Sequence, residues 1–148
     1  MLRVYLDTTV ISAAFDERTP DRQRHTQRFF ESADQYECVV SELTVEELLR
    51  TPDIGRREQL LLMVHRFRHV EIDASMHLLA SALVDADVLP PAYYDDALHI
   101  AAASMSQADV LLSWNFRHLV NRRRRAMVNL LLSTRGRPTM EIIAPPEL

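Results

Sequence analysis

Short apolar segments that favour strands alternate with segments that favour helices along this sequence, and this alternation most constrains the fold. Five segments rich in β-branched and other apolar residues predict strands, at 4–6, 36–41, 70–73, 110–114 and 140–143. Helices are predicted between them, at 22–33, 56–67, 74–86, 92–106 and 122–132. Strands that alternate with helices form βαβ units. We therefore expect an α/β fold, a three-layer α/β/α sandwich around a mostly parallel central sheet.

The chain is 148 residues long and contains no internal repeat or linker, so we expect a single domain over residues 1–148. No apolar run approaches the roughly 20 residues that cross a bilayer, and no membrane partner is expected. Cys38 is the only cysteine. A lone cysteine excludes internal disulfides and thiolate zinc clusters, and it suits a reducing, cytoplasmic location.

Two residue types are missing or scarce in a way that excludes several function classes. All 17 basic residues are arginines, so receiver-type phosphoacceptors, Schiff-base enzymes and Walker nucleotide sites lack their lysine. With only two glycines, no glycine-rich loop can bind a pyrophosphate. The net charge of −4 is not typical of a nucleic-acid binder. Acidic residues gathered in a metal site would, however, give such a total while arginines line the approach.

Several acidic or amide side chains fall beside expected strand ends and helix starts: Asp7, Glu46, Glu47, Asp95, Asp96, Asp109 and Asn115. In an open α/β sheet, the carboxyl ends of the strands face the crevice where ligands bind. Neighbouring residues on a helix point about 100° apart, so only one of each adjacent acidic pair can face a shared site. The spacing alone leaves open which member of each pair that is.

Each of these residues also has a purely structural interpretation. Asp7 could cap the first helix, Glu47 could complete a capping box with Thr44, and Asp95 or Asp96 could favour a helix N-terminus. Taken together, they predict a shared site. Carboxylates about 4 Å apart repel by roughly 4 kcal/mol at an effective dielectric constant near 20, so a cluster needs a proton or a cation.

Oxygen ligands without cysteine favour Mg²⁺ or Mn²⁺ over zinc. Such an ion can bind a phosphodiester and activate water. The residues therefore indicate metal-dependent phosphodiester hydrolysis.

Four blocks of the sequence carry a resemblance to a known family: Leu6–Ile11 (LDTTVI), Ser41–Leu48 (SELTVEEL), Tyr94–Ala103 (YDDALHIAAA) and Ala108–Leu119 (ADVLLSWNFRHL). In this order and spacing they resemble a PIN domain, and among PIN domains a VapC-type ribonuclease toxin. The resemblance extends over nearly the whole chain. It selects Glu47 over Glu46 and Asp96 over Asp95.

The resemblance implies a PIN-like fold and an Mg²⁺- or Mn²⁺-dependent endoribonuclease that cleaves RNA. It also implies a homodimer and a cognate antitoxin protein, as VapC-type members usually have. The residues expected to carry catalysis are Asp7, Glu47, Asp96 and Asn115. The expected metal ligands are Asp7, Asp96, Glu47 and Asp109.

One position departs from the family. Many relatives carry an aspartate where this chain has Asn115, and asparagine offers a carbonyl ligand without a charge. One metal ion could then be held well and a second weakly, or Asp109 or Asp95 could complete the site.

Substrate contacts are expected from three residues near these blocks. The Thr8 hydroxyl could orient a ligand or water, or cap the first helix. Arg117 and His118 could contact the RNA backbone, although surface arginines more often only solvate a face. The run 122–125 is the densest positive stretch, a candidate phosphate contact or antitoxin dock, or simply a solvated helix face. His99 is expected in the core or behind the ligands rather than as a base.

Two other functions compete with this prediction. A haloacid-dehalogenase-type phosphatase also begins with an aspartate after a strand. It needs a second aspartate where Thr9 stands, and it needs a lysine. A catalytically weak PIN-fold RNA-binding or scaffold module is the stronger alternative, because Asn115 removes a charge from the site.

Overall fold

Five parallel strands form one sheet in the computed structural model, which describes residues 1–148. The strand order is β3-β2-β1-β4-β5, and every neighbouring pair is parallel. The strands are β1 (Arg3–Leu6), β2 (Glu37–Ser41), β3 (Arg68–Val70), β4 (Val110–Leu112) and β5 (Glu141–Ile143).

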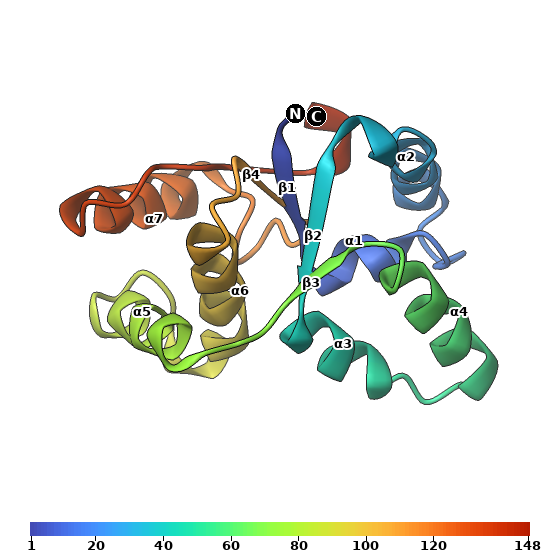
Figure 1. Cartoon of the computed structure of the whole chain (residues 1–148), viewed down its shortest axis with the longest axis horizontal. Helices are drawn as coiled ribbons and strands as arrows, with labels where there is room; N and C mark the ends of the chain where they lie inside the picture. Colours follow the sequence, from blue (N-terminus) through green and yellow to red (C-terminus); the bar gives the residue numbers. More distant parts are fainter.

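Seven α-helices and three 3₁₀ turns connect the strands. They are α1 (Thr8–Ala13), α2 (Pro20–Glu31), η1 (Ala33–Gln35), α3 (Glu42–Leu49), α4 (Ile54–Val64), α5 (Ala74–Asp85), η2 (Pro91–Tyr93), α6 (Tyr94–Met105), α7 (Arg122–Thr134) and η3 (Pro145–Glu147). Figure 1 shows α1 to α4 on one side of the strands and α5 to α7 on the other. The predicted α/β sandwich is confirmed, and its sheet is entirely parallel. No helix is both long and apolar enough to cross a membrane.

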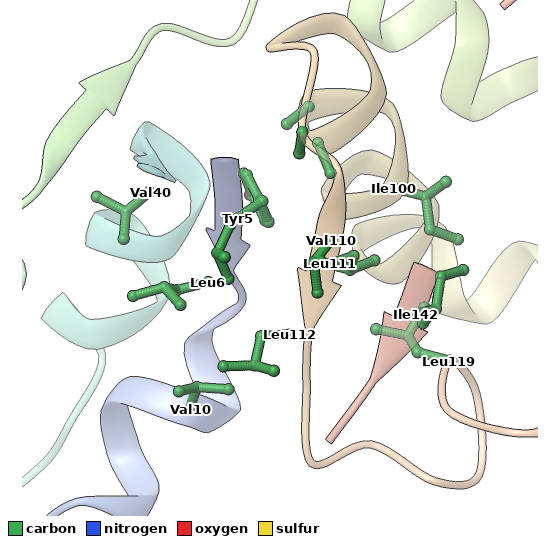
Figure 2. Packing of buried hydrophobic residues seen from close by; sticks show 14 of the residues in the cluster. Tyr5, Leu6, Val10, Val40, Ile100, Val110, Leu111, Leu112, Leu119 and Ile142 are labelled. Carbon is green, nitrogen blue, oxygen red and sulfur yellow. The ribbon is translucent and has the colours of Figure 1, made fainter. Parts of the chain in front are cut away.

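The core lies on both faces of the central strands. Val4, Tyr5 and Leu6 of β1 are fully buried, and all of β4 is buried as well. Strands covered by helices on both faces are expected to be continuously apolar. Figure 2 shows these side chains packed between the strands and residues such as Ile100 and Leu119. In α6, every residue from Ala97 to Ser104 is buried, because small side chains let the helix approach the sheet closely.

The third and fourth strands differ from their predicted bounds. β3 pairs with β2 through Arg68–Val70, whereas the alternation of Val70 and Ile72 had predicted a strand over 70–73. Asp73 instead caps α5 by accepting a hydrogen bond from the Met76 amide at 2.9 Å. β4 ends at Leu112, because the Trp114 amide leaves the ladder and donates to Thr9 Oγ1 at 2.9 Å.

The capping box expected from Thr44 and Glu47 does not form. α3 begins at Glu42, with Ser41 at its N-cap position, so Glu47 lies in the second turn of the helix. Glu47 is therefore free to make contacts away from the end of its own helix.

The strand order reverses between β1 and β4. The chain runs outward from β1 through β2 to β3, and then returns to add β4 and β5 on the other side of β1. In open parallel sheets, ligands bind outside the carboxyl ends of the strands at such a reversal. Asp7 directly follows β1 and Ser113 directly follows β4, so both residues lie at this place.

Candidate functional site

Asp7 is held by hydroxyl groups from two separate segments. Thr9 Oγ1 donates to Asp7 Oδ1 and Ser113 Oγ donates to Asp7 Oδ2, both at 2.5 Å. The Val10 amide also donates to Oδ1, at 3.3 Å, so Asp7 is the N-cap of α1 as its structural interpretation predicted. Burial raises the pKa of Asp7, while His99 and the hydroxyl donors act in the opposite direction. A cation near Asp7 would therefore offset the free-energy cost of burying its ionised carboxylate.

Glu47 is oriented by a chain of buried hydrogen bonds. Its Oε1 accepts from Thr8 Oγ1 at 3.1 Å and lies 2.5 Å from Nε2 of His99. On the other side of the imidazole, Nδ1 of His99 lies 2.7 Å from the Tyr5 hydroxyl, which lies 2.7 Å from Ser41 Oγ. Thr8 thus contacts a carboxylate rather than capping α1.

Glu47 and His99 each favour the charged form of the other. Burial works against the ionised form of Glu47, but the hydrogen bond and charge of His99 hold the pKa of Glu47 below its ordinary value. Burial likewise disfavours the imidazolium, yet Glu47, Asp7 and Asp96 together raise the pKa of His99. His99 is buried and lies behind Glu47, where it was expected to lie rather than to act as a base.

Asp96 accepts one side-chain hydrogen bond, and its pKa is raised, as is that of Asp7. It lies in the first turn of α6, where Nδ2 of Asn115 approaches its Oδ2 at 3.5 Å. Burial together with repulsion from Asp7 and Glu47 raises the pKa of Asp96 to about 6, although His99 acts in the other direction. Asp7, Glu47 and Asp96 thus lie close enough to act on one another electrostatically.

Asn115 faces this group through its amide nitrogen. Its Oδ1 already accepts a hydrogen bond from the His118 amide at 2.9 Å, which closes the turn after β4. Its backbone amide donates to Ser113 Oγ at 2.9 Å. The carbonyl expected to act as a ligand is therefore engaged within the turn.

Asp109 lies at the opposite end of the sheet. Its Oδ2 accepts from the Arg3 amide at 2.8 Å, and its own amide donates to the Arg3 carbonyl at 2.9 Å. Asp109 precedes β4, whereas Asp7 and Asn115 follow β1 and β4. The hypothesis that Asp109 completes the metal site is wrong in its geometry, because opposite ends of parallel strands do not meet.

A groove of about 640 Å³ opens beside the acidic residues. Thr8, Glu47 and Asn115 belong both to the groove wall and to the group described above, and Arg22 and Arg117 add positive charge to the wall. His118 lies outside the groove lining, and its ring packs against Tyr93 at an interplanar angle of 31° and a centroid distance of 3.6 Å. Of the residues predicted to touch substrate, Thr8 and Arg117 line this groove.

The arginine run at 122–125 is divided between two roles. Arg124 donates to the Val88 carbonyl, and Arg125 donates to the Ile142 carbonyl at 3.3 Å, so both tie α7 to neighbouring segments. Arg122 and Arg123 are exposed. Arg117, Arg123 and Arg124 line a second cavity of about 460 Å³.

The acidic residues fit a weakly held hard cation better than a permanent metal centre. No three His, Cys, Asp or Glu side chains converge into a ready-made metal-binding cluster. Mg²⁺ usually takes only one or two protein carboxylates and keeps several waters for exchange with substrate phosphate. Asp7, Glu47 and Asp96 offer the oxygen donors that such an ion binds. The ion would in turn favour the ionised form of Asp96, whose pKa is raised.

The PIN domain family model matches residues 4–118, which includes every residue of this group. The chain belongs to the PIN domain family. No functionally curated protein was found with significant sequence similarity to this PIN domain protein.

Solved structures of VapC proteins share the fold at low sequence identity. VapBC2 from Rickettsia felis, bound to a DNA fragment from its promoter, has a TM-score of 0.62 and 12% identity, covering 97% of this chain and 98% of that chain. DNA-bound VapBC from Salmonella typhimurium has a TM-score of 0.60 and 18% identity, covering 98% and 99%. Mycobacterium tuberculosis VapC20, described as a Sarcin-Ricin loop cleaving toxin, has a TM-score of 0.59 and 17% identity, covering 78% and 92%.

Proposed function

We propose that this PIN domain protein is an Mg²⁺- or Mn²⁺-dependent endoribonuclease that hydrolyses RNA phosphodiester bonds. The proposed site consists of Asp7, Glu47, Asp96 and Asn115, at the carboxyl ends of β1, β2 and β4. The observation that carries the proposal is the grouping of Asp7, Glu47 and Asp96 beside an open groove, where burial, and to a lesser extent repulsion from Asp7 and Glu47, raises the pKa of Asp96 to about 6. Structural carboxylates seldom tolerate such repulsion, and functional sites often exploit it.

The chain's own residues divide the work of such a site. Asp7, fixed by Thr9 and Ser113, and Glu47, fixed by Thr8 and His99, present carboxylates that can hold a cation without reorganising. Asp96 supplies the third carboxylate. A bound divalent ion would neutralise charge on the phosphodiester and make water a better nucleophile.

Positive charge on the groove wall complements the acidic residues. Arg22 and Arg117 line the groove next to Thr8 and Asn115. Arginines at such a place can hold the phosphates that flank the scissile bond and so fix the register of the strand. Their position supports the proposal that this chain binds RNA although its net charge is negative.

Replacement of Asp96 by asparagine tests the proposal. Asp96→Asn keeps the shape of the side chain and should lower Mg²⁺-dependent RNA cleavage at least about 100-fold, because a carboxylate ligand and its charge are lost. Asp95→Asn is the matched control, since Asp95 is the neighbouring residue but is exposed, and it should retain near-wild-type cleavage. Cleavage is followed on labelled RNA with and without EDTA. Undiminished cleavage by Asp96→Asn would remove the proposal.

Asn115 supports a second candidate function, a PIN-fold RNA-binding or scaffold module with weak catalysis. Its side chain contributes no charge, and its Oδ1 is bound to the His118 amide. Calorimetric titration with Mg²⁺ or Mn²⁺ separates the two functions. If the protein is a nuclease, the ion should bind the wild type and bind Asp96→Asn more weakly. If it is a scaffold, the heat of titration should be the same for the two proteins.

We further propose that residues 1–148 form one domain. We also propose that the chain is the toxin of a type II toxin–antitoxin pair and that it forms a homodimer. The support is the likeness in fold to VapC proteins solved in toxin–antitoxin complexes, some of them with DNA. A neighbouring gene for a small partner that binds the purified chain and inhibits cleavage is the expected finding. Light scattering measures the oligomeric state.

A further inference from the structure

The groove beside the acidic residues has an aromatic wall built by the segment that follows β4. Asn115 turns toward Asp96, while Trp114 and Phe116, on either side of it, line the groove. The two aromatic rings meet edge to face, with centroids 6.1 Å apart. Asn115 therefore connects the aromatic wall to Asp96.

Trp114 is held in place by hydrogen bonds, whereas the ring of Phe116 is exposed to solvent. The Trp114 indole donates to Thr26 Oγ1 at 2.8 Å and its backbone amide donates to Thr9 Oγ1 at 2.9 Å, so only 7% of Trp114 is exposed. Phe116 is 45% exposed and is the only aromatic residue among the exposed large hydrophobic side chains. A fixed aromatic base that carries an exposed ring is a suitable platform for another planar group.

Arg22 brings positive charge to the same wall. Its guanidinium carbon lies 5.3 Å from the Trp114 ring centroid and 5.4 Å from that of Phe116. Asp16, which lines the same groove, forms its ion pair with Arg18 at 2.9 Å and leaves the charge of Arg22 uncompensated. An aromatic face beside an unpaired arginine matches a nucleotide, whose base stacks and whose phosphate is anionic.

We propose that Trp114, Phe116 and Arg22 form a subsite for one unpaired base of single-stranded RNA next to the scissile phosphodiester. The base stacks on the exposed ring of Phe116, and Arg22 holds an adjoining phosphate. The inference rests on the proposed ribonuclease function and adds to that site a stacking position for one base. Stacking accepts every base, so the subsite contributes affinity more than sequence choice.

The binding test compares a short oligo(A) RNA with the same ribose-phosphate backbone lacking its bases, on the uncleaving Asp96→Asn background. The protein should bind the RNA about tenfold more tightly than the abasic backbone, since a stacked base contributes on that order. Phe116→Ala should remove most of this preference, and Phe116→Tyr should keep it. Leu62→Ala, which truncates an exposed apolar residue on α4, should also keep it. Trp114 is the only tryptophan, so its fluorescence reports binding directly.

The role of Arg22 is tested by the salt dependence of the same binding. Arg22→Gln should weaken binding to both probes and lower the slope of log affinity against log salt by about 0.7, the value for one phosphate contact on a single strand. Arg24→Gln on the same helix is the control, because Arg24 is exposed and pairs with Asp21. Equal slopes for the two variants would overturn the assignment of Arg22.

A base preference that survives Phe116→Ala, or no preference at all, overturns the subsite. The same holds if the aromatic wall binds a protein partner instead, since RNA affinity would then not depend on Phe116. Cleavage by the protein with Asp96 intact is measured separately. Cleavage without base preference refutes only the subsite, whereas absence of metal-dependent cleavage refutes the proposed function.

Discussion

Nε2 of His99 lies 2.5 Å from Oε1 of Glu47, and Asp96 precedes His99 by three residues on α6. The buried His99 ring therefore acts electrostatically on several carboxylates and makes a direct hydrogen bond to only one of them, Glu47. This explains the division between the acids, since His99 lowers the pKa of Glu47 while Asp96, burdened by burial and by its acidic neighbours, has a pKa of about 6. The ionisation of Asp96, like that of the buried Asp7, should therefore respond to an added cation.

The free energy of unfolding should depend on pH through Asp96 in protein freed of metal. The pKa of Asp96 rises from 3.8 to about 6 on folding, so its protonated form stabilises the protein below about pH 4 and this stabilisation is lost as pH rises through 6. Asp96 is partly open to solvent, and after screening about 1 kcal/mol of penalty remains.

Asp96→Asn should therefore be about 1 kcal/mol more stable than wild type near pH 7 and equally stable near pH 4. Urea unfolding at the two pH values measures the difference, with Asp85→Asn, at an exposed position at the end of α5, as the control that follows wild type. A difference that does not change with pH would contradict the electrostatic origin of the effect.

Mg²⁺ or Mn²⁺ should raise the melting temperature. At a concentration tenfold above its Kd, an ion that binds only the folded state adds about 1.4 kcal/mol, which corresponds to about 3–6 °C for a protein of this size. EDTA should reverse the shift and Asp96→Asn should lose most of it. Asp109→Asn should keep it in full, because Asp109 is bound to Arg3 at the other end of the sheet. Differential scanning fluorimetry provides the measurement, and an equal loss in both variants would place the ion elsewhere.

Asn115→Asp should strengthen metal binding. The new carboxylate can still accept from the His118 amide through one oxygen while the other faces Asp96, which adds a negative charge where Nδ2 now lies 3.5 Å from Asp96 Oδ2. We expect about tenfold higher affinity for Mg²⁺ by calorimetry, or about 1.4 kcal/mol. Gln59→Glu makes the same charge change on the exposed side of α4 and should leave the affinity unchanged. Weaker binding in Asn115→Asp would show that the ion avoids this side of the site.

Tyr5→Phe should destabilise the protein by about 1–3 kcal/mol. The variant leaves Nδ1 of His99 and Oγ of Ser41 without the partner that each has at 2.7 Å, in a region closed to water. Tyr36→Phe is the matched control, because Tyr36 packs against Phe29 at a half-buried position. Denaturant unfolding gives the difference. Equal stability of the two variants would mean that the buried hydrogen-bond chain contributes little.

The sequence predicts the sheet well because strand propensity and helical spacing act locally. It also places Asp7, Glu47 and Asp96 at element boundaries, although the choice between Glu46 and Glu47, and between Asp95 and Asp96, came from the family resemblance. The structure agrees with the second choice in one respect, since Asp95 is exposed and Asp96 is half-buried.

The contacts behind the acidic residues could not be predicted from the sequence. Ser113 donates to Asp7 across 106 positions and His99 meets Glu47 across 52, and no local pattern encodes such partners. Thr9 had a weak signal, because a hydroxyl two residues after an aspartate often bonds to it. Asp109 was misplaced because it precedes the fourth strand, whereas Asp7 and Asn115 follow theirs, and the crevice opens only at the carboxyl end.

Three donors bond to the Asp7 carboxylate, which therefore links the ends of two neighbouring strands and also belongs to the acidic group. Thr9 and Val10 reach it from α1, and Ser113 reaches it from the end of β4. These hydrogen bonds hold the Asp7 carboxylate in one position. Asp96 accepts only one side-chain hydrogen bond, at 3.5 Å, so adjustment to an incoming ion should come from Asp96. A substitution at Asp7 would harm folding and chemistry together, which makes Asp96 the more informative residue to alter.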